Sequence, residues 1–514
     1  MEALANNKHH DQQAVYVKNL RLKFPGEGSL LFKDLSFTVK RGEKVLLLGP
    51  SGCGKSTLLQ VLSGLIPHSI EIPLTYDAIQ LPASYGFVFQ DPDTQFCMPY
   101  VDEELGFVLE NMQIPREKMD NLIQFALQQV GLGNLQQHTL IQHLSQGMKQ
   151  RLALASVLLL EPDVLFLDEP SALLDPEGTG DIWNAVKQVS NDKTVIIVEH
   201  KIDHIAEWVD RIVLFNDLGE IIADGDPDQV FTSFHTDIKK YGIWYPGVWN
   251  DYLQSRRYKE IMMDRKNVSE QIDKSASDTS LGDQAKDVIS TEDIIYLQNF
   301  RGFHGKQEKI HVPEVAVQRE SWITIVGENG AGKSTLLLSL MHLLRTSGTY
   351  ELYGEKVNLD MKKQEPPKEL ALVFQNPELQ FVTQTVGEEI GFSLQLQGEK
   401  PRVIQTKVEE LTDTFYLPVD PLHHPYQLSI GQKRRLSVAS AIVNGAPILL
   451  LDEPTFGQDA RSTFVMLEQL EELRKNGTTI IMVTHDMNIV NHFATHQWMI
   501  EQGKLISVEE IFHK

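Results

Sequence analysis

The stretch GPSGCGKST at residues 49–57 decides the fold, and it returns as GENGAGKST at residues 327–335. Each stretch follows a short apolar run and opens a segment with helical periodicity, which is the setting that a phosphate-binding loop requires. Glycines let successive backbone N–H groups converge on phosphate oxygens, and the N-terminus of the following helix adds its positive end. An incidental glycine-rich turn would not recur twice in this setting, so we predict two nucleotide-binding loops.

The lysine and serine near the end of each loop have separate roles in phosphate binding. Lys55 and Lys333 would bring a positive charge to the β- and γ-phosphates, and Ser56 and Ser334 would hold Mg²⁺. Backbone donors and the lysine are expected to lower the pKa of the Cys53 thiol. The other loop residues predicted to surround the phosphates are Gly49, Pro50, Ser51, Gly52, Gly54 and Thr57, and Gly327, Glu328, Asn329, Gly330, Ala331, Gly332 and Thr335.

Four further motifs recur in the same order. The pairs are VFQDPDTQF (88–96) and VFQNPELQF (373–381), LSQGMKQRLALA (144–155) and LSIGQKRRLSVA (428–439), FLDEPS (166–171) and LLDEPT (450–455), and VIIVEH (195–200) and IIMVTH (480–485). The offset between copies stays between 278 residues (327 minus 49) and 285 residues (373 minus 88). A near-constant offset indicates a duplicated domain, and we place the two domains at residues 14–235 and 293–514.

Residues 236–292 lie between the two domains. Residues 231–258, which begin at the end of the first domain, are rich in aromatic side chains, and we expect them to pack onto that domain. Residues 267–292 are polar and acidic, which is typical of a flexible linker.

Each half has the pattern of an α/β domain. Short apolar runs such as residues 44–48 and 195–198 alternate with helical patterns, as expected for strands buried on both faces. This alternation predicts a mostly parallel sheet with helices on both sides. Between Gln90 and Asp168 the sequence predicts an inserted helical subdomain, with helices at residues 101–111, 116–130 and 146–160.

Two acidic residues follow a buried strand in each half. Asp168 and Asp452 stand at the strand ends, where a ligand of Mg²⁺ is expected beside a phosphate-binding loop. Glu169 and Glu453 come one residue later and could polarise a water for attack on the γ-phosphate. An acidic pair that merely caps a turn is the alternative for one instance, but pairing with the loop in both halves favours catalysis.

Polar residues also end two other strands of each half. Gln90 and Gln375 are suited to contact Mg²⁺ or the attacking water, and His200 and His485 could donate a hydrogen bond to the γ-phosphate. A single histidine at a strand end is more often structural, but its recurrence favours a functional role.

With these motifs in place, the two halves resemble the nucleotide-binding domains of ATP-binding cassette proteins. The resemblance depends most on the signature, LSQG at 144–147 and LSIG at 428–431, which distinguishes this family from other phosphate-loop ATPases. It implies that the two halves face each other head to tail within the chain. Both halves keep the glutamate and the histidine, which implies two sites that hydrolyse ATP with Mg²⁺.

Head-to-tail pairing would make each ATP site composite. The resemblance implies that the residues of the first loop share one ATP with Ser429 and Gly431, and that the second loop shares another with Ser145 and Gly147. Gln146 and Ile430 replace the usual third-position glycine of the signature. These replacements are tolerable because the serine hydroxyl and the glycine backbone would contact the phosphate.

The adenine contact is less symmetric. The family stacks adenine on an aromatic side chain that precedes the phosphate-binding loop, and Phe24 fits this position in the first half. The second half offers only Phe303 or His304 after a shortened segment.

Composition limits the partners. The formal net charge of −23 argues against broad binding to nucleic acid or anionic lipid. No apolar run approaches the roughly 18 residues of a membrane span, and residues 1–13 do not have the pattern of a secretory signal. Two cysteines are too few for a four-cysteine zinc site and fit a reducing cytosol. A membrane role must therefore use a protein partner, and the resemblance to transporter ATPases implies a peripheral place at the cytoplasmic face.

Several kinds of tandem cassette protein remain possible. Ribosome-acting tandem ATPases usually carry a long basic segment between cassettes, whereas residues 267–292 hold six acids and two lysines. Tandem sugar-importer ATPases are the other alternative. The segments PDTQF and VDEELGF (92–96 and 101–107) recur as PELQF and VGEEIGF (377–381 and 386–392). They resemble ATPases of energy-coupling factor transporters, which import vitamins and transition metals, and the fused form resembles those associated with thiamine or its hydroxymethylpyrimidine precursor.

This last resemblance implies two membrane partners, a transmembrane coupling subunit and a membrane-embedded substrate-binding subunit. We expect each repeated segment to form a docking groove, apolar at the phenylalanine and acidic at the rim. The predicted groove residues are Phe96, Glu103, Glu104, Phe381, Glu388 and Glu389. An acidic amphipathic helix that packs only on its own domain is the plain alternative.

Overall fold

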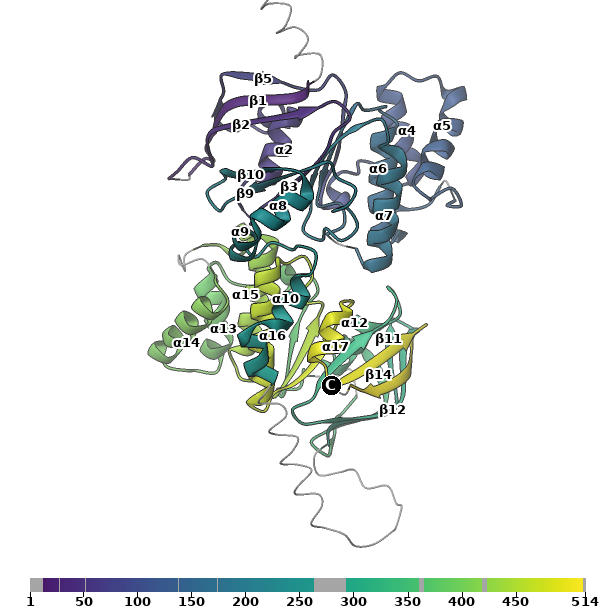
Figure 1. Cartoon of the computed structure of the whole chain (residues 1–514). Helices are drawn as coiled ribbons and strands as arrows, with labels where there is room; N and C mark the ends of the chain where they lie inside the picture. The colour runs from purple at the N-terminus through teal and green to yellow at the C-terminus, as the bar shows by residue number, and fades with distance from the viewer. Residues whose placement is uncertain are drawn as a thin grey trace, which may run out of the picture. The chain divides into compact units, whose positions relative to one another are not determined.

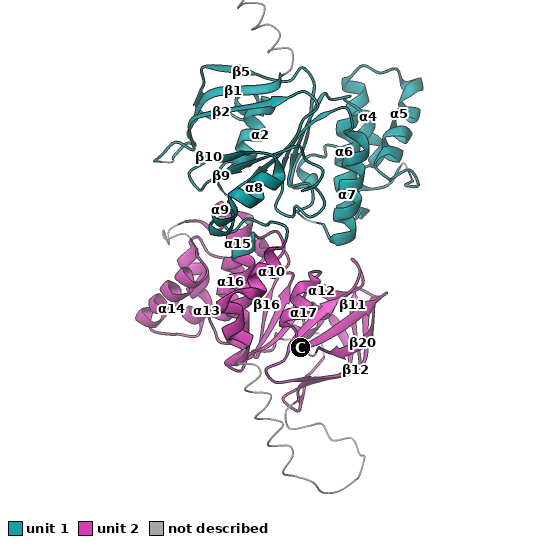
Figure 2. Ribbon diagram, in the orientation of Figure 1, with its two compact units in different colours: residues 1–246, 459–461 teal, residues 247–458, 462–514 magenta. Residues whose placement is uncertain are grey.

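The computed structural model describes residues 13–26, 28–50, 52–136, 138–172, 174–262, 293–359, 365–417 and 423–511. These residues form two compact units (Figure 2). Unit 1 takes in the described residues up to Pro246 with Asp459–Arg461, and unit 2 takes in those from Gly247 to Gln458 and from Ser462 onward. The linker predicted at 267–292 lies outside the described residues.

Unit 1 contains two sheets. The first is antiparallel and contains β1 (Gln13–Leu22), β2 (Phe32–Lys40), β4 (Leu74–Thr75) and β5 (Ala78–Gln80). The second has the order β10-β9-β3-β8-β7-β6. Its strands are β3 (Lys44–Leu48), β6 (Tyr85–Val88), β7 (Val164–Asp168), β8 (Thr194–Val198), β9 (Arg211–Phe215) and β10 (Ile221–Gly225). All neighbours in it are parallel except β9 and β10.

The parallel strands of unit 1 are buried along their whole length. Every residue of β7 (VLFLD) and β8 (TVIIV) is buried, as expected for strands covered on both faces. The helices are α2 (Lys55–Ser63), α3 (Leu65–His68), α4 (Val101–Asn111), α5 (Arg116–Gln129), α6 (Gln146–Leu158), α7 (Pro176–Val189), α8 (Pro227–Ser233) and α9 (His235–Lys240). The predicted site residues follow the carboxyl ends of β3, β6, β7 and β8. Because these strands are parallel, the site residues lie at the same edge of the sheet.

Where unit 1 has two sheets, the strands of unit 2 form a single sheet, in the order β15-β14-β11-β12-β20-β19-β13-β18-β17-β16. Its strands are β11 (Asp293–His304), β12 (Gln307–Gln318), β13 (Trp322–Val326), β14 (Arg345–Leu352), β15 (Glu355–Lys356), β16 (Leu370–Val373), β17 (Ile448–Asp452), β18 (Thr479–Val483), β19 (His496–Glu501) and β20 (Lys504–Glu510). Its helices are α10 (Val248–Gln254), α12 (Lys333–Leu340), α13 (Val386–Leu396), α14 (Pro401–Thr414), α15 (Ile430–Ile442), α16 (Ala460–Lys475) and α17 (Met487–Phe493).

The inserted helical subdomain is present in both units. In unit 1, α4, α5 and α6 lie between β6 and β7 in the chain and stand beside the sheet (Figure 1). Their bounds agree with the predicted helices to within two residues. In unit 2, α13, α14 and α15 take the same place in the chain. The predicted α/β fold, with a mostly parallel core and an inserted helical subdomain in each half, is confirmed.

The expectation that the aromatic tail packs onto the first domain is wrong from residue 247 onward. Tyr252 stacks on Phe464 with ring centroids 3.9 Å apart, and Trp249 meets the same ring edge-on at 5.0 Å. Tyr258 packs against Phe493. Aromatic pairs in these geometries add to the free energy of apolar burial, so this segment belongs to unit 2.

In the described part of the chain, every helix is too short or too polar to span a membrane.

Candidate functional site

The first predicted phosphate-binding loop connects β3 to the start of α2. Gly54 caps α2 in the left-handed region, with φ of 100°. A Cβ at this position would lie 2.8 Å from the ring of Phe32, so the loop needs glycine for conformation and for space. Ser51, which we also assigned to the loop, lies outside the described residues.

Lys55 is buried inside this loop. Its Nζ donates to the carbonyls of Gly49 at 2.8 Å and Pro50 at 2.9 Å. The ammonium group therefore lies beside the backbone N–H groups at the N-terminus of α2, where a helix favours an anion. This arrangement of donors fits a nucleotide phosphate.

The second loop, between β13 and α12, repeats the geometry. Gly332 caps α12 with φ of 103°. Lys333 Nζ donates to the carbonyls of Gly327 at 2.8 Å and Glu328 at 2.9 Å. A Cβ at Gly327 would lie 2.1 Å from the carbonyl oxygen of Ile500, so only glycine fits there.

The predicted Mg²⁺ ligands are adjacent in the first half. Ser56 Oγ donates to Asp168 Oδ1 at 2.7 Å. Burial raises the pKa of Asp168 to about 6, although the hydrogen bond from Ser56 acts in the opposite direction. A bound dication would favour the ionised carboxylate, and hydroxyl and carboxylate oxygens are donors that Mg²⁺ prefers.

In the second half, burial likewise raises the pKa of Asp452 to about 6, with a hydrogen bond from Ser334 opposing it. Among the described residues, no group of three His, Cys, Asp or Glu side chains could hold a metal ion.

Two other predicted residues of the first site, Gln90 and His200, contact the carboxylate of Glu169. Gln90 Nε2 donates to Glu169 Oε2 at 2.8 Å, and His200 Nε2 lies 3.1 Å from Glu169 Oε1. Burial alone would raise the pKa of Glu169, but the charge and hydrogen bond of His200 and the charge of Lys55 hold it below its usual value. Burial lowers the pKa of His200, but the charge of Glu169 and its hydrogen bond to His200 have the larger combined effect. The pKa of His200 is therefore raised above its usual value. These opposite shifts favour the charged form of each side chain.

The second site is similar but not identical. His485 Nε2 lies 3.3 Å from Glu453 Oε1, whereas Gln375 is exposed. Arg434 Nη1, from α15, donates to the backbone carbonyl of Glu453, and burial lowers the pKa of this guanidinium to about 10.

Both catalytic glutamate candidates have an unusual backbone conformation. The φ angle is 48° at Glu169 and 49° at Glu453, in the left-handed region that non-glycine residues rarely adopt. Such strain costs of order 1–3 kcal/mol and is common at functional sites. The turn after each strand therefore holds its glutamate in a specific direction.

The signature residues begin helices. Ser145 caps α6 and accepts the N–H of Met148, and Ser429 caps α15 and accepts the N–H of Gln432. In α15 the Gln432 side chain also accepts the N–H of Ser429. Met148 lacks the oxygen for this second bond, so only the second signature forms a capping box. Gly147 and Gly431 lie in the first turn of these helices, where backbone N–H groups can bind an anion.

The candidates for adenine contact lie in different surroundings. Phe24 is half-buried and packs against the core of unit 1. His304 Nε2 lies 3.4 Å from the Thr335 hydroxyl, which places His304 beside the second loop. Phe303 instead lies under the guanidinium of Arg345.

The expected low pKa of the Cys53 thiol is wrong. Burial raises the pKa of Cys53 and outweighs the nearby charge of Lys55. The side chain is only 2% exposed, whereas Cys97 is exposed. A buried, protonated thiol is a poor nucleophile.

We therefore predict that iodoacetamide modifies Cys97 at least about tenfold faster than Cys53 in the native chain. Mass spectrometry of Cys53→Ser and Cys97→Ser variants, each with one thiol, measures the two rates. Labelling of Cys53 as fast as that of Cys97 would contradict the burial of this thiol.

Sequence reasoning missed two residues beside the sites, Arg434 and Glu199. Glu199 follows β8 and precedes His200, and it is buried. An acid that directly continues a run of buried apolar residues was the available signal. Arg434 gave none, because basic residues are common near the start of such a helix.

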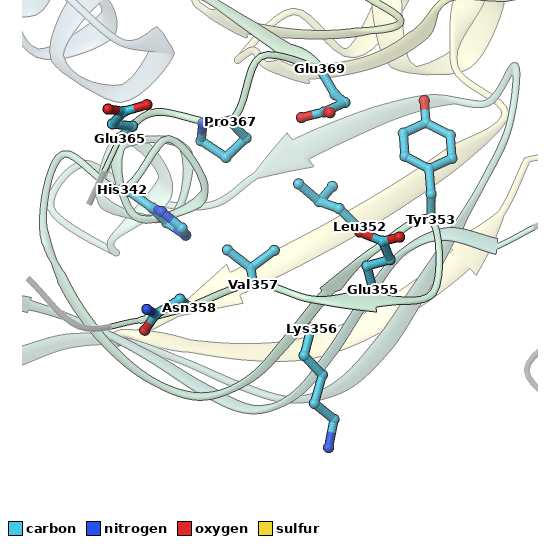
Figure 3. Close-up of a pocket in the computed structure, with 10 residues that line it drawn as sticks. All are labelled: His342, Leu352, Tyr353, Glu355, Lys356, Val357, Asn358, Glu365, Pro367 and Glu369. Carbon is cyan, nitrogen blue, oxygen red and sulfur yellow. The ribbon is translucent and has the colours of Figure 1, made fainter. Parts of the chain in front are cut away.

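A cavity of about 570 Å³ lies elsewhere in unit 2. His342, Tyr353, Glu355 and Glu369 are among the residues that line it (Figure 3). None of the predicted site residues lines it, so it is separate from the phosphate-binding loop.

Two residues of the predicted docking grooves have another role. Glu104 is buried, and its Oε2 accepts the backbone N–H groups of Cys97 and Met98 at 2.8 Å. Glu389 is buried and accepts those of Val382 and Thr383. The expectation that these two acids form a groove rim is wrong, because their carboxylates hold the preceding loop.

Comparison with known proteins agrees with the repeated motifs. The family model described as ABC transporter matches residues 32–172 and 310–456. The chain is 35% identical, over 93% of its length and 88% of the relative's, to YkoD of Bacillus subtilis, which is provisionally named an HMP/thiamine import ATP-binding protein. It is 31% identical to a protein of Methanosarcina acetivorans provisionally named an ABC transporter ATP-binding protein, over 96% of this chain and 85% of the relative.

A similar fold is found in a solved structure that matches most of the chain. It is the complex of the archaeal ribosomal stalk protein aP1 with the ribosome recycling factor aABCE1, with a TM-score of 0.58 and 19% identity over 96% of this chain and 90% of that one. At this identity the likeness shows the fold alone.

Proposed function

The chain belongs to the ABC transporter family as an ATPase with two ATP-binding domains in tandem, and on this premise we propose that it drives an importer of the energy-coupling factor type. It would act from the cytoplasmic face of the membrane as a peripheral subunit. Its partners would be a transmembrane coupling subunit and a membrane-embedded substrate-binding subunit. The domains would span residues 14–235 and 293–514.

The observation that carries the catalytic part is the gathering of Gln90 and His200 on the carboxylate of Glu169. In the proposed reaction Glu169 polarises the water that attacks the γ-phosphate, and His200 exchanges its contact with Glu169 for one with that phosphate. Glu453 and His485 would do the same at the second site. Charge stabilisation and positioning supply most of the catalysis in phosphoryl transfer.

Mg²⁺ would be held by Ser56, Asp168 and Gln90 in one half and by Ser334, Asp452 and Gln375 in the other. Such an ion would supply positive charge that offsets the charge developing on the phosphates. In the first half the Ser56–Asp168 hydrogen bond already brings two of these ligands together.

We propose that each ATP lies between the loop of one half and the signature of the other. A helix N-terminus supplies backbone donors to an anion, and both signatures begin helices that present a serine and a glycine. Ser429 and Gly431 would close on the ATP held by Lys55, and Ser145 and Gly147 on the ATP held by Lys333.

The transport part of the proposal is supported by the segments that follow Gln90 and Gln375. In the second half two apolar side chains of this segment are open to solvent, with Leu379 71% exposed and Val382 65% exposed. Glu103 and Glu388 are exposed at the starts of α4 and α13. An apolar surface with an acidic edge suits a short basic helix of a transmembrane subunit.

We predict that Glu103→Lys with Glu388→Lys lowers the amount of chain retained on membranes at least about tenfold, because like charges would then face the basic helix. Sedimentation with membranes of the source cells measures retention, and basal ATPase activity should stay within about twofold. The matched control is Glu110→Lys with Glu399→Lys, which makes the same charge change at exposed positions outside the proposed edge.

Equal retention of both double variants would exclude the acidic edge. Identification of the membrane proteins that copurify with the chain in mild detergent tests the importer itself. If the wild-type chain has no membrane-bound fraction, the ribosome-acting alternative is favoured.

We further propose that the cargo is thiamine or its hydroxymethylpyrimidine precursor. The support is the provisional name of the Bacillus subtilis relative. Binding of labelled thiamine to the copurified membrane subunits tests this assignment, and a sugar ligand there would favour a sugar importer.

A further inference from the structure

A buried acid beside the first site has no acidic counterpart in the second. Glu199 follows β8, precedes His200 and is only 2% exposed. The equivalent position in the second half is Thr484, which precedes His485. Burial of a carboxylate is unfavourable unless its oxygens have hydrogen-bond partners, so its contacts indicate what Glu199 holds in place.

The carboxylate of Glu199 connects two segments of the first site. Its Oε1 accepts the backbone N–H of His200 at 2.8 Å, and its Oε2 accepts the hydroxyl of Ser171 at 2.7 Å. Ser171 is buried and stands two residues after Glu169, in the turn that holds Glu169 in its left-handed conformation. One side chain therefore ties the backbone of His200 to the turn that carries Glu169.

The second site is held differently. The Thr484 hydroxyl accepts the backbone N–H of Asp486, which follows it in the same loop, so this bond does not reach the turn that carries Glu453. The carbonyl of Glu453 instead accepts a hydrogen bond from Arg434 of α15. At the position equivalent to Arg434, the first half has Gln150, which donates to the carbonyl of Phe89 and not to the glutamate turn.

We propose that Glu199 is a positioning residue of the first ATP site, which fixes the backbone of His200 relative to Glu169. The inference rests on the proposed roles of Glu169 and His200. Both residues must be aligned with the γ-phosphate at the same time, and small displacements of such groups reduce the rate strongly. Glu199 acts through its hydrogen bonds, so an uncharged side chain of the same shape can replace it.

The test measures each site separately in the full-length chain. In a Glu453→Gln background only the first site turns over, and there Glu199→Thr should lower kcat about tenfold or more while KM for ATP changes less than about twofold. Glu199→Gln should restore kcat to within about threefold, because an amide can bond to both His200 and Ser171. In a Glu169→Gln background, which reports the second site, Glu199→Thr should change kcat less than about twofold.

Ser171→Ala provides a second variant with a smaller change of volume. It removes the other end of the connection, so its effect and that of Glu199→Thr should not multiply in the double variant. An unchanged kcat for Glu199→Thr at the first site, multiplying effects, or equal loss in Glu199→Gln and Glu199→Thr would each overturn the positioning role. A loss of less than about 100-fold in kcat in the Glu169→Gln, Glu453→Gln chain would overturn the proposed roles of the glutamates themselves, and this turnover is measured first.

Discussion

Replacement of both Glu169 and Glu453 by glutamine is expected to abolish steady ATP turnover and to leave ATP binding intact. Glutamine keeps the shape of the side chain but cannot act as a base toward the attacking water. General base catalysis contributes roughly 10²- to 10⁴-fold, so the double variant should lose at least about 100-fold in kcat. Phosphate release and direct binding of labelled ATP measure the two quantities.

The single variants provide the control for this prediction. Each should keep the turnover of one site, because each half carries its own glutamate and histidine pair. Asp224→Asn, which changes a carboxylate of the Arg211–Asp224 ion pair between β9 and β10, tests for an unspecific effect of a lost charge. Normal hydrolysis by the double variant would show that the two glutamates have a structural role only.

Substitution of a signature glycine is expected to inactivate the ATP site of the opposite half. In a Glu453→Gln background, which leaves only the first site active, Gly431→Asp should lower turnover about 100-fold. The added carboxylate would repel the γ-phosphate at the start of α15. A Cβ at Gly431 would lie 3.9 Å from the guanidinium of Arg435, which is ordinary contact, so the loss would reflect charge and not steric conflict.

The matched variant is Gly147→Asp in the same Glu453→Gln background. A Cβ there would be 3.6 Å from Gly178, which is also ordinary contact. If signatures act on the opposite half, Gly147→Asp should reduce this turnover far less than Gly431→Asp does. The reverse ranking would show that each signature serves its own half and would refute head-to-tail pairing.

The loops show why some of the site could be predicted from sequence. The glycines, lysine and serine of residues 49–57 act through backbone geometry and short local contacts, such as Lys55 with the carbonyls of Gly49 and Pro50. These interactions lie within six residues of one another. The same holds for the helix caps at Ser145 and Ser429, so local spacing was enough to locate them.

The predictions from sequence are wrong where a residue's environment depends on segments that are distant in the chain. Glu104 looks like a surface acid of an amphipathic helix, yet its carboxylate binds the backbone of Cys97 and Met98. Cys53 lies among donors in sequence, but burial sets the direction of its pKa shift. Tyr252 is near the first domain in the chain, yet it stacks on Phe464, more than 200 residues later.

The α/β class, the duplication, the two phosphate-binding loops and the family could be predicted from sequence, because they follow from motifs whose geometry is local and whose order is repeated. The folded structure was needed to show that Gln90 and His200 contact Glu169, whereas Gln375 is exposed. It alone revealed that Glu199 ties His200 to Ser171 and that Arg434 holds Glu453. Residues that contact each other in these sites come from different strands and helices. Their contacts depend on how the whole domain packs, and motif spacing in the sequence does not contain that information.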